Sequence, residues 1–222
     1  DAGLSRGLGD VYKRQSWNFP SPFIVMLSYI GIFAAAIASV VTFGFWMPFI
    51  GFIINPRPYL APKTWLVFAF GEGFFIGLIS LSFETMFPGI VLEAVSLTFC
   101  VAATLLFLYK SGIVKPSQNF VLMVCSAVFG IFLFYIGTLI YSLVTGVSPE
   151  IFSGSSNASI GLSLFIVAMA AFSLVLDFDI IEQSAEYGSP KYMEYFGAMA
   201  LVTTLIWLYI EILRLLAKFR SR

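Results

Sequence analysis

The sequence predicts an all-α polytopic membrane protein that folds as one helical bundle. Hydrophobic residues make up 59% of the 222 residues, charged residues only 11%, and the mean hydropathy is +0.95. The apolar residues gather in runs of about 20 residues or more, the length that an α-helix needs to cross a bilayer. These runs are continuous and do not alternate in period two, so helices are favoured over the strands of a membrane β-barrel.

The first 15 residues differ from the rest of the chain. They read DAGLSRGLGDVYKRQ, which is polar and rich in glycine, and they lack the apolar stretch of a secretory signal peptide. We interpret residues 1–15 as a non-native or disordered leader and residues 16–222 as a single transmembrane helical bundle.

The first apolar run spans residues 23–54 and is too long for one perpendicular helix. It contains Gly44, Pro48 and Gly51, so we expect either a tilted, kinked helix or a helix followed by a short interfacial piece. Three prolines in residues 55–62 end the run, because proline lacks a backbone N–H and disfavours helix in the residue before it.

Five further runs predict helices over residues 64–83, 90–109, 119–145, 159–182 and 192–217. Polar segments that contain glycine or proline separate most of them, at residues 110–116, 146–158 and 188–190. Together with the first run, they predict six spans.

Basic residues in the short loops predict the orientation. The loops near residues 55–63, 110–118 and 183–192 share one side, whereas those near 84–89 and 146–158 contain no Lys or Arg. The first three loops contain Arg57, Lys63, Lys110, Lys115 and Lys191. Since short cytoplasmic loops are enriched in Lys and Arg, we place this side in the cytoplasm. The basic C-terminal tail would then lie outside, against the rule.

Acidic residues lie in or beside the apolar runs, namely Glu72, Asp177, Asp179, Glu182, Glu194 and Glu211. An ionised carboxylate within a bilayer is costly, so such residues indicate an ion path, a proton relay or a helix–helix pair. A rise of 1.5 Å per residue puts Glu72 roughly 12 Å, Asp177 roughly 7 Å and Asp179 roughly 5 Å from the cytoplasmic helix ends. Glu211 lies roughly 28 Å down its helix, near the outer face, where it can also pair with Arg214 at i,i+3.

Several function classes are excluded by what the sequence lacks. There is no His, the commonest metal ligand and the usual base near neutral pH. The sequence also lacks HExxH, GxSxG and P-loop motifs, and a net charge of zero gives no footprint for nucleic acid. We therefore predict that the protein is not an enzyme, has no resident cofactor and binds no nucleic acid. We expect Cys100 and Cys125, inside apolar runs, to be packed thiols.

The C-terminal part of the sequence resembles the Bax inhibitor-1 family, in its bacterial branch. The resemblance is most specific in LDFDIIEQSAEYG at residues 176–188, and it continues through Pro190, Glu194-Tyr195 and WLYIEILRLL at residues 207–216. FGEGFFIG at residues 70–77 and PGIVLEA at residues 88–94 are similar too. Counting back eleven residues from Gly188 places Asp177 at the family's aspartate.

The resemblance implies seven helices, six of them around a central seventh, so we expect this chain to lack the first helix. It also implies a calcium leak across the membrane that protons gate, in which a second aspartate on the last helix pairs with the first. Here the corresponding residues are Val202, Thr203 and Thr204, none of which is acidic. Glu72, which Gly71, Gly73 and Gly77 flank in a pattern typical of close helix packing, is one candidate partner for Asp177, and Glu211 is the other.

Three functions remain open from the sequence. The first is a multi-pass protein of the bacterial plasma membrane that leaks cations, with Ca²⁺ as the permeant or bound ion. Carboxylates are suitable ligands for Ca²⁺, and two close carboxylates would share a proton. The candidate Ca²⁺- and proton-sensing residues are therefore Asp177, Glu72, Asp179 and Glu211. The second is a regulator or adaptor that binds other membrane proteins, with structural acids. The third is a secondary transporter, which the lack of a clear internal repeat disfavours.

Overall fold

The computed structural model describes residues 61–146, 154 and 156–222. They all belong to one compact unit, Gly44–Arg222, and the first apolar run at 23–54 lies outside them. This part of the chain contains no strand and forms α3 (Ala61–Met86), α4 (Ile90–Lys110), α5 (Gln118–Thr145), α7 (Asn157–Glu186) and α8 (Tyr192–Arg220). All five helices are long and apolar enough to cross a membrane, which confirms an all-α polytopic membrane protein.

The helices begin and end at residues with clear capping roles. The hydroxyls of Ser117 and Ser156 accept backbone N–H groups at the starts of α5 and α7, both at 3.2 Å. The start of α4 is capped from outside the helix, because the carboxylate of Glu84 accepts the N–H groups of Gly89 at 2.6 Å and Val91 at 3.1 Å. Gly89 has a φ of 82°, a left-handed conformation that glycine adopts without strain.

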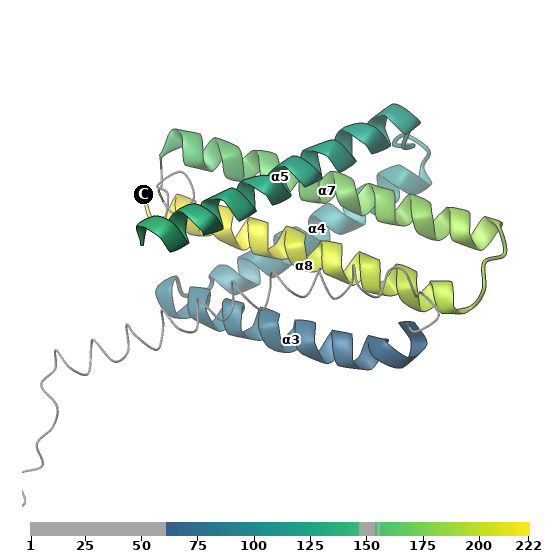
Figure 1. Ribbon diagram of the computed structural model, residues 1–222, viewed down its shortest axis with the longest axis horizontal. Helices are drawn as coiled ribbons and strands as arrows, with labels where there is room; N and C mark the ends of the chain where they lie inside the picture. Colours follow the sequence, from purple (N-terminus) through teal and green to yellow (C-terminus); the bar gives the residue numbers. More distant parts are fainter. Residues whose placement is uncertain (1–60, 147–153, 155) are drawn as a thin grey trace, which may run out of the picture. The chain divides into compact units, whose positions relative to one another are not determined.

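Helix α8 is the central helix of the described bundle (Figure 1). It packs against α7, α4 and α3, while α5 packs against α7. Helices α7 and α8 are in tight contact at Gly197, where an added Cβ would lie 3.0 Å from the Ile181 side chain. A larger residue there would force the Ile181 side chain to shift. A central last helix is the arrangement that the family resemblance implies.

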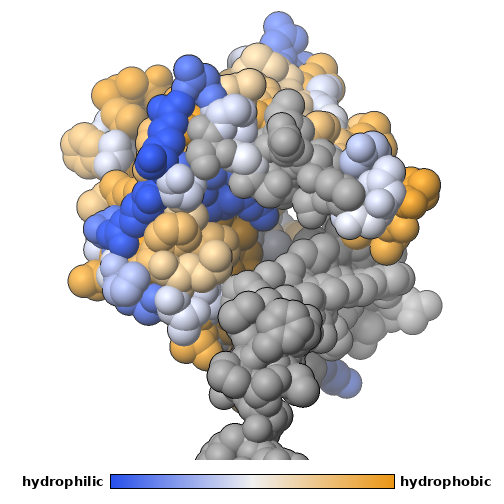
Figure 2. Space-filling model, turned by 90° about the vertical axis from the view of Figure 1, so that its left-hand side faces the viewer, coloured by the Kyte–Doolittle hydropathy of each residue, from blue (hydrophilic) through white to orange (hydrophobic). Residues whose placement is uncertain are grey.

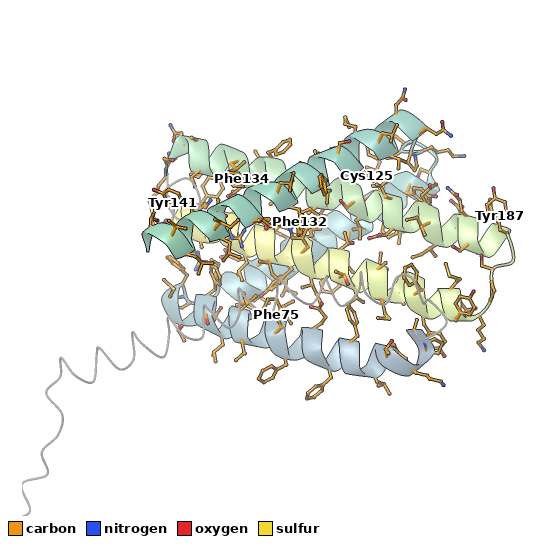
Figure 3. All side chains as sticks on the ribbon, in the orientation of Figure 1. Phe75, Cys125, Phe132, Phe134, Tyr141 and Tyr187 are labelled. Carbon is orange, nitrogen blue, oxygen red and sulfur yellow. The ribbon has the colours of Figure 1, made fainter. Side chains whose placement is uncertain are left out.

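The outward faces of the bundle are apolar. Large hydrophobic side chains are mostly exposed along α3, α4 and α5, for example Phe70, Leu92 and Leu143, and the many side chains that project outward are visible in Figure 3. Such a surface is stable against lipid tails rather than water. Cys100 and Cys125 belong to this surface, since both are exposed, so the expectation that they are packed thiols is wrong.

Candidate functional site

Asp177 lies on α7 where that helix packs against α8. It is half-buried, and its Oδ2 atom is buried with no hydrogen-bond partner among the described residues. Helix α7 continues to Glu186 and does not end near Glu182, as the sequence had indicated. Asp177 is thus nine residues from the helix end, or about 13–14 Å, rather than about 7 Å. It therefore lies about 8 Å from the midpoint of this 30-residue helix.

Thr204 of α8 is the polar residue that faces Asp177. Its hydroxyl lies near the carboxyl group of Asp177 and donates to the carbonyl oxygen of Ala200 at 3.2 Å, one turn earlier in its own helix. A hydroxyl has a single proton to donate. The backbone carbonyl of Ala200 takes this proton, so the Thr204 hydroxyl does not satisfy the Asp177 carboxylate.

Glu72 is buried on α3, with 3% of its surface exposed, and among the described residues no hydrogen bond or ion pair reaches its carboxyl group. Eleven residues separate it from the start of α3, or about 16 Å of rise, so it shares the depth of Asp177. However, α3 and α7 are not among the closely packed helix pairs of the described bundle, and no hydrogen bond joins the two acids there. A Cβ added at Gly73 or Gly77 would meet nothing within 4 Å, so the close packing expected at these glycines is not found.

Asp179 and Glu182 meet at a tyrosine of α4. The hydroxyl of Tyr109 donates to Glu182 and lies 3.3 Å from Oδ1 of Asp179. The amide of Gln183, one turn along α7, donates to Oδ2 of Asp179 at 2.6 Å. These two acids therefore form a cluster of their own, nearer the end of α7 than Asp177.

Glu211 lies at the other end of the bundle and has a full set of partners. Its carboxylate, 2% exposed, accepts hydrogen bonds from the Tyr135 hydroxyl of α5 at 2.6 Å and from Arg214 at 3.0 and 3.1 Å. The i,i+3 ion pair with Arg214 that the spacing had offered is confirmed. A carboxylate that is already neutralised in this way is a structural anchor and has no contact with Asp177 or Glu72.

A polar network around this end of α8 had no signal in the sequence. Lys218, 6% exposed, donates to the hydroxyl of Ser163 at 2.7 Å and to the carbonyl oxygen of Ser159 at 3.3 Å. Arg220 donates to Glu93 of α4 at 2.6 Å and to the carbonyl oxygen of Pro88 at 2.8 Å. The view onto this end shows hydrophilic residues gathered between hydrophobic ones (Figure 2). The basic residues of the tail therefore have partners within the bundle, unlike the exposed Lys110 and Lys191 of the loops.

The four candidate acids do not converge on one metal centre. Among the described residues, no group of three or more His, Cys, Asp or Glu side chains is placed to hold a metal ion. Asp177 has Thr204 as its neighbour, Asp179 has Tyr109 and Gln183, and Glu211 has Tyr135 and Arg214. Of the four candidates, Asp177 and Glu72 are the two that have no cationic partner in this part of the chain and take no part in the Tyr109 cluster.

Together, five apolar spanning helices, a central last helix and a buried aspartate between the last two helices define a multi-pass helical membrane protein with a polar site inside its bundle. The chain belongs to the Bax inhibitor 1 like family, whose model matches residues 16–221. Comparisons with curated proteins and with solved structures gave no match.

Proposed function

We propose that this protein lets cations, Ca²⁺ in particular, leak passively across the plasma membrane of a bacterium, and that Asp177 is the residue at which ions and protons control the leak. The observation that carries this proposal is the buried Oδ2 atom of Asp177, which has no hydrogen-bond donor among the described residues.

An unsatisfied carboxylate inside a bilayer is unstable by several kcal/mol. A proton or a cation would satisfy it, because carboxylate oxygens are hard ligands that Ca²⁺ accepts. Either would also change the interaction of the Asp177 carboxyl group with the nearby Thr204 of α8. Ion or proton binding would thereby change how α7 packs on the central helix α8 and gate the leak.

Glu72 is the proposed second acid of the path. It is buried on α3, which packs on α8, as α7 does, and its distance from the helix start gives it a depth similar to that of Asp177. Two acids at one depth around the central helix would attract a cation that moves along this helix. If they act on the same ion, Glu72→Gln and Asp177→Asn should be non-additive, with a coupling of about 0.5–3 kcal/mol in a double-mutant cycle.

The test is Ca²⁺ flux into liposomes that contain the protein, measured between about pH 6 and pH 8. Asp177→Asn should abolish the pH dependence, because an amide does not change its charge in this range. Glu194→Gln, an exposed acid at the start of α8, is the matched control and should behave as wild type. Identical pH profiles for Asp177→Asn and wild type would refute the role of Asp177.

A second candidate function is that of a membrane-embedded regulator that binds other membrane proteins through its helices. The Glu211 network supports it, because this buried acid is held by Tyr135 and Arg214 in the way expected of a structural contact. In that case Asp177 would join α7 to α8 as a structural contact. Wild-type protein would then give no more Ca²⁺ flux than empty liposomes, and Asp177→Asn would lower stability only.

A further inference from the structure

Tyr109, in the last turn of α4, makes a three-point contact with the end of α7. Its hydroxyl group lies against the carboxylates of Asp179 and Glu182, and its ring lies 6.0 Å from that of Phe178, tilted by 50°. These residues lie one, two and five positions after Asp177 in the chain, so one side chain of α4 contacts the segment next to the candidate site.

The end of α4 holds Tyr109 in a fixed place. The carbonyl oxygen of Tyr109 accepts the N–H of Gly112 at 3.0 Å, and the N–H groups of Ile113 and Val114 both return to Leu108. Gly112 has a φ of 72°, the left-handed conformation that closes a helix and that glycine favours. The backbone that carries Tyr109 is therefore capped and rigid, whereas Ile180–Gln183 of α7 are exposed.

The chemistry of the contact makes Tyr109 hard to replace. A phenol has one proton, so it donates fully to one carboxylate at a time, and Asp179 receives a second donor from Gln183. No Lys or Arg among the described residues forms an ion pair with Asp179 or Glu182; the neighbouring Lys110 is exposed and has no such bond. The Tyr109 hydroxyl is thus the described donor that ties this acidic face of α7 to another helix.

We propose that Tyr109 is a positioning residue that holds the acidic end of α7 against α4 and thereby sets Asp177 opposite Thr204. The effect on ion flux rests on the function proposed above, but the effect on α7 does not. Asp177 and Asp179 are two residues apart on one helix, about 3 Å along its axis. A shift of the held segment therefore moves Asp177 with it, because the helix between them has no room to absorb the change.

The test compares Tyr109→Phe with Tyr187→Phe. The first keeps the ring contact with Phe178 and removes only the hydroxyl. The second removes a hydroxyl from an 83% exposed tyrosine that projects from the end of α7 (Figure 3). Hydrogen exchange of the backbone amides of residues 178–186, measured on the full chain in nanodiscs, should become about tenfold faster in Tyr109→Phe and stay unchanged in Tyr187→Phe.

The same two variants are then measured for Ca²⁺ flux against pH. A positioning role predicts a displaced pH midpoint in Tyr109→Phe, which a purely structural contact would not produce. Unchanged amide exchange would overturn the proposal whatever the flux. Faster exchange with an unchanged midpoint, in a wild type that does leak, would reduce Tyr109 to a structural contact and overturn the positioning role. If the wild type carries no flux, the proposed function fails, and amide exchange alone decides whether Tyr109 holds α7.

Discussion

Replacing Glu211 with alanine provides the most direct test of how the bundle is held together. Its carboxylate is 2% exposed and accepts the Tyr135 hydroxyl and two hydrogen bonds from Arg214. Alanine would leave the Arg214 guanidinium, 28% exposed, without this counter-charge, and the Tyr135 hydroxyl of α5 would lose its bond to Glu211 but keep its hydrogen bond from Arg214 of α8.

The size of the effect follows from the burial of each partner. Removing one member of a buried ion pair costs about 3–5 kcal/mol, and a lost hydrogen bond to a charged group costs about 1.5–3 kcal/mol. The partial exposure of Arg214 allows water to replace some of this interaction. We therefore expect Glu211→Ala to lower the free energy of unfolding by about 2–4 kcal/mol.

The measurement is equilibrium unfolding in mixed micelles with increasing SDS, followed by far-UV circular dichroism. Glu194→Ala, at an exposed acid of the same helix, is the control and should change stability by at most about 1 kcal/mol. In a double-mutant cycle, Glu211→Ala and Arg214→Ala should be coupled by about 1–3 kcal/mol. The role of Glu211 as a structural anchor would be refuted if the effects of the two substitutions were additive. It would also be refuted if Glu211→Ala lowered the free energy of unfolding no more than the control does.

Three further predictions concern other contacts. Thr204→Asp would place a second carboxylate beside Asp177, so calorimetric titration should show tighter Ca²⁺ binding than in wild type; equal affinity would mean that the Thr204 position does not face the ion. Ser163→Ala removes the hydroxyl that accepts from buried Lys218 and should cost about 1–3 kcal/mol in the SDS assay, unlike Ser96→Ala on the exposed face of α4. Glu84→Ala removes the cap of α4, so the amide protons of Gly89 and Val91 should exchange faster, and unchanged rates would show that the cap is dispensable.

The helices of the described region were predictable because each is a continuous apolar run, and hydropathy depends on composition alone. The ends of these helices were less predictable. The last turn of α7 is built from the polar residues Gln183–Glu186, so hydropathy ended the helix early, although the first left-handed glycine comes at Gly188. This error placed Asp177 too near the end of its helix.

Some contacts of the candidate site could likewise be predicted from the sequence, and others could not. The Glu211–Arg214 pair could be predicted, because both residues lie one turn apart on one helix. Tyr109 and Ser163 could not, since each meets its partner from a separate helix, and their roles depend on how the helices are rotated and aligned. The outward position of Cys100 and Cys125 could not be predicted either. Lipid and the protein interior are equally apolar, so residues that face either of them have the same composition.

The polar network at the end of α8 has a consequence for how the protein is made. Arg214, Lys218 and Arg220 belong to α8, whereas Tyr135, Ser163 and Glu93 belong to α5, α7 and α4, which leave the ribosome before it. These three helices can therefore be in the membrane before the charged groups that they bind arrive. Insertion of α8 is then energetically coupled to the presence of α4, α5 and α7, so the charged end of α8 enters a polar site that is already formed rather than lipid alone.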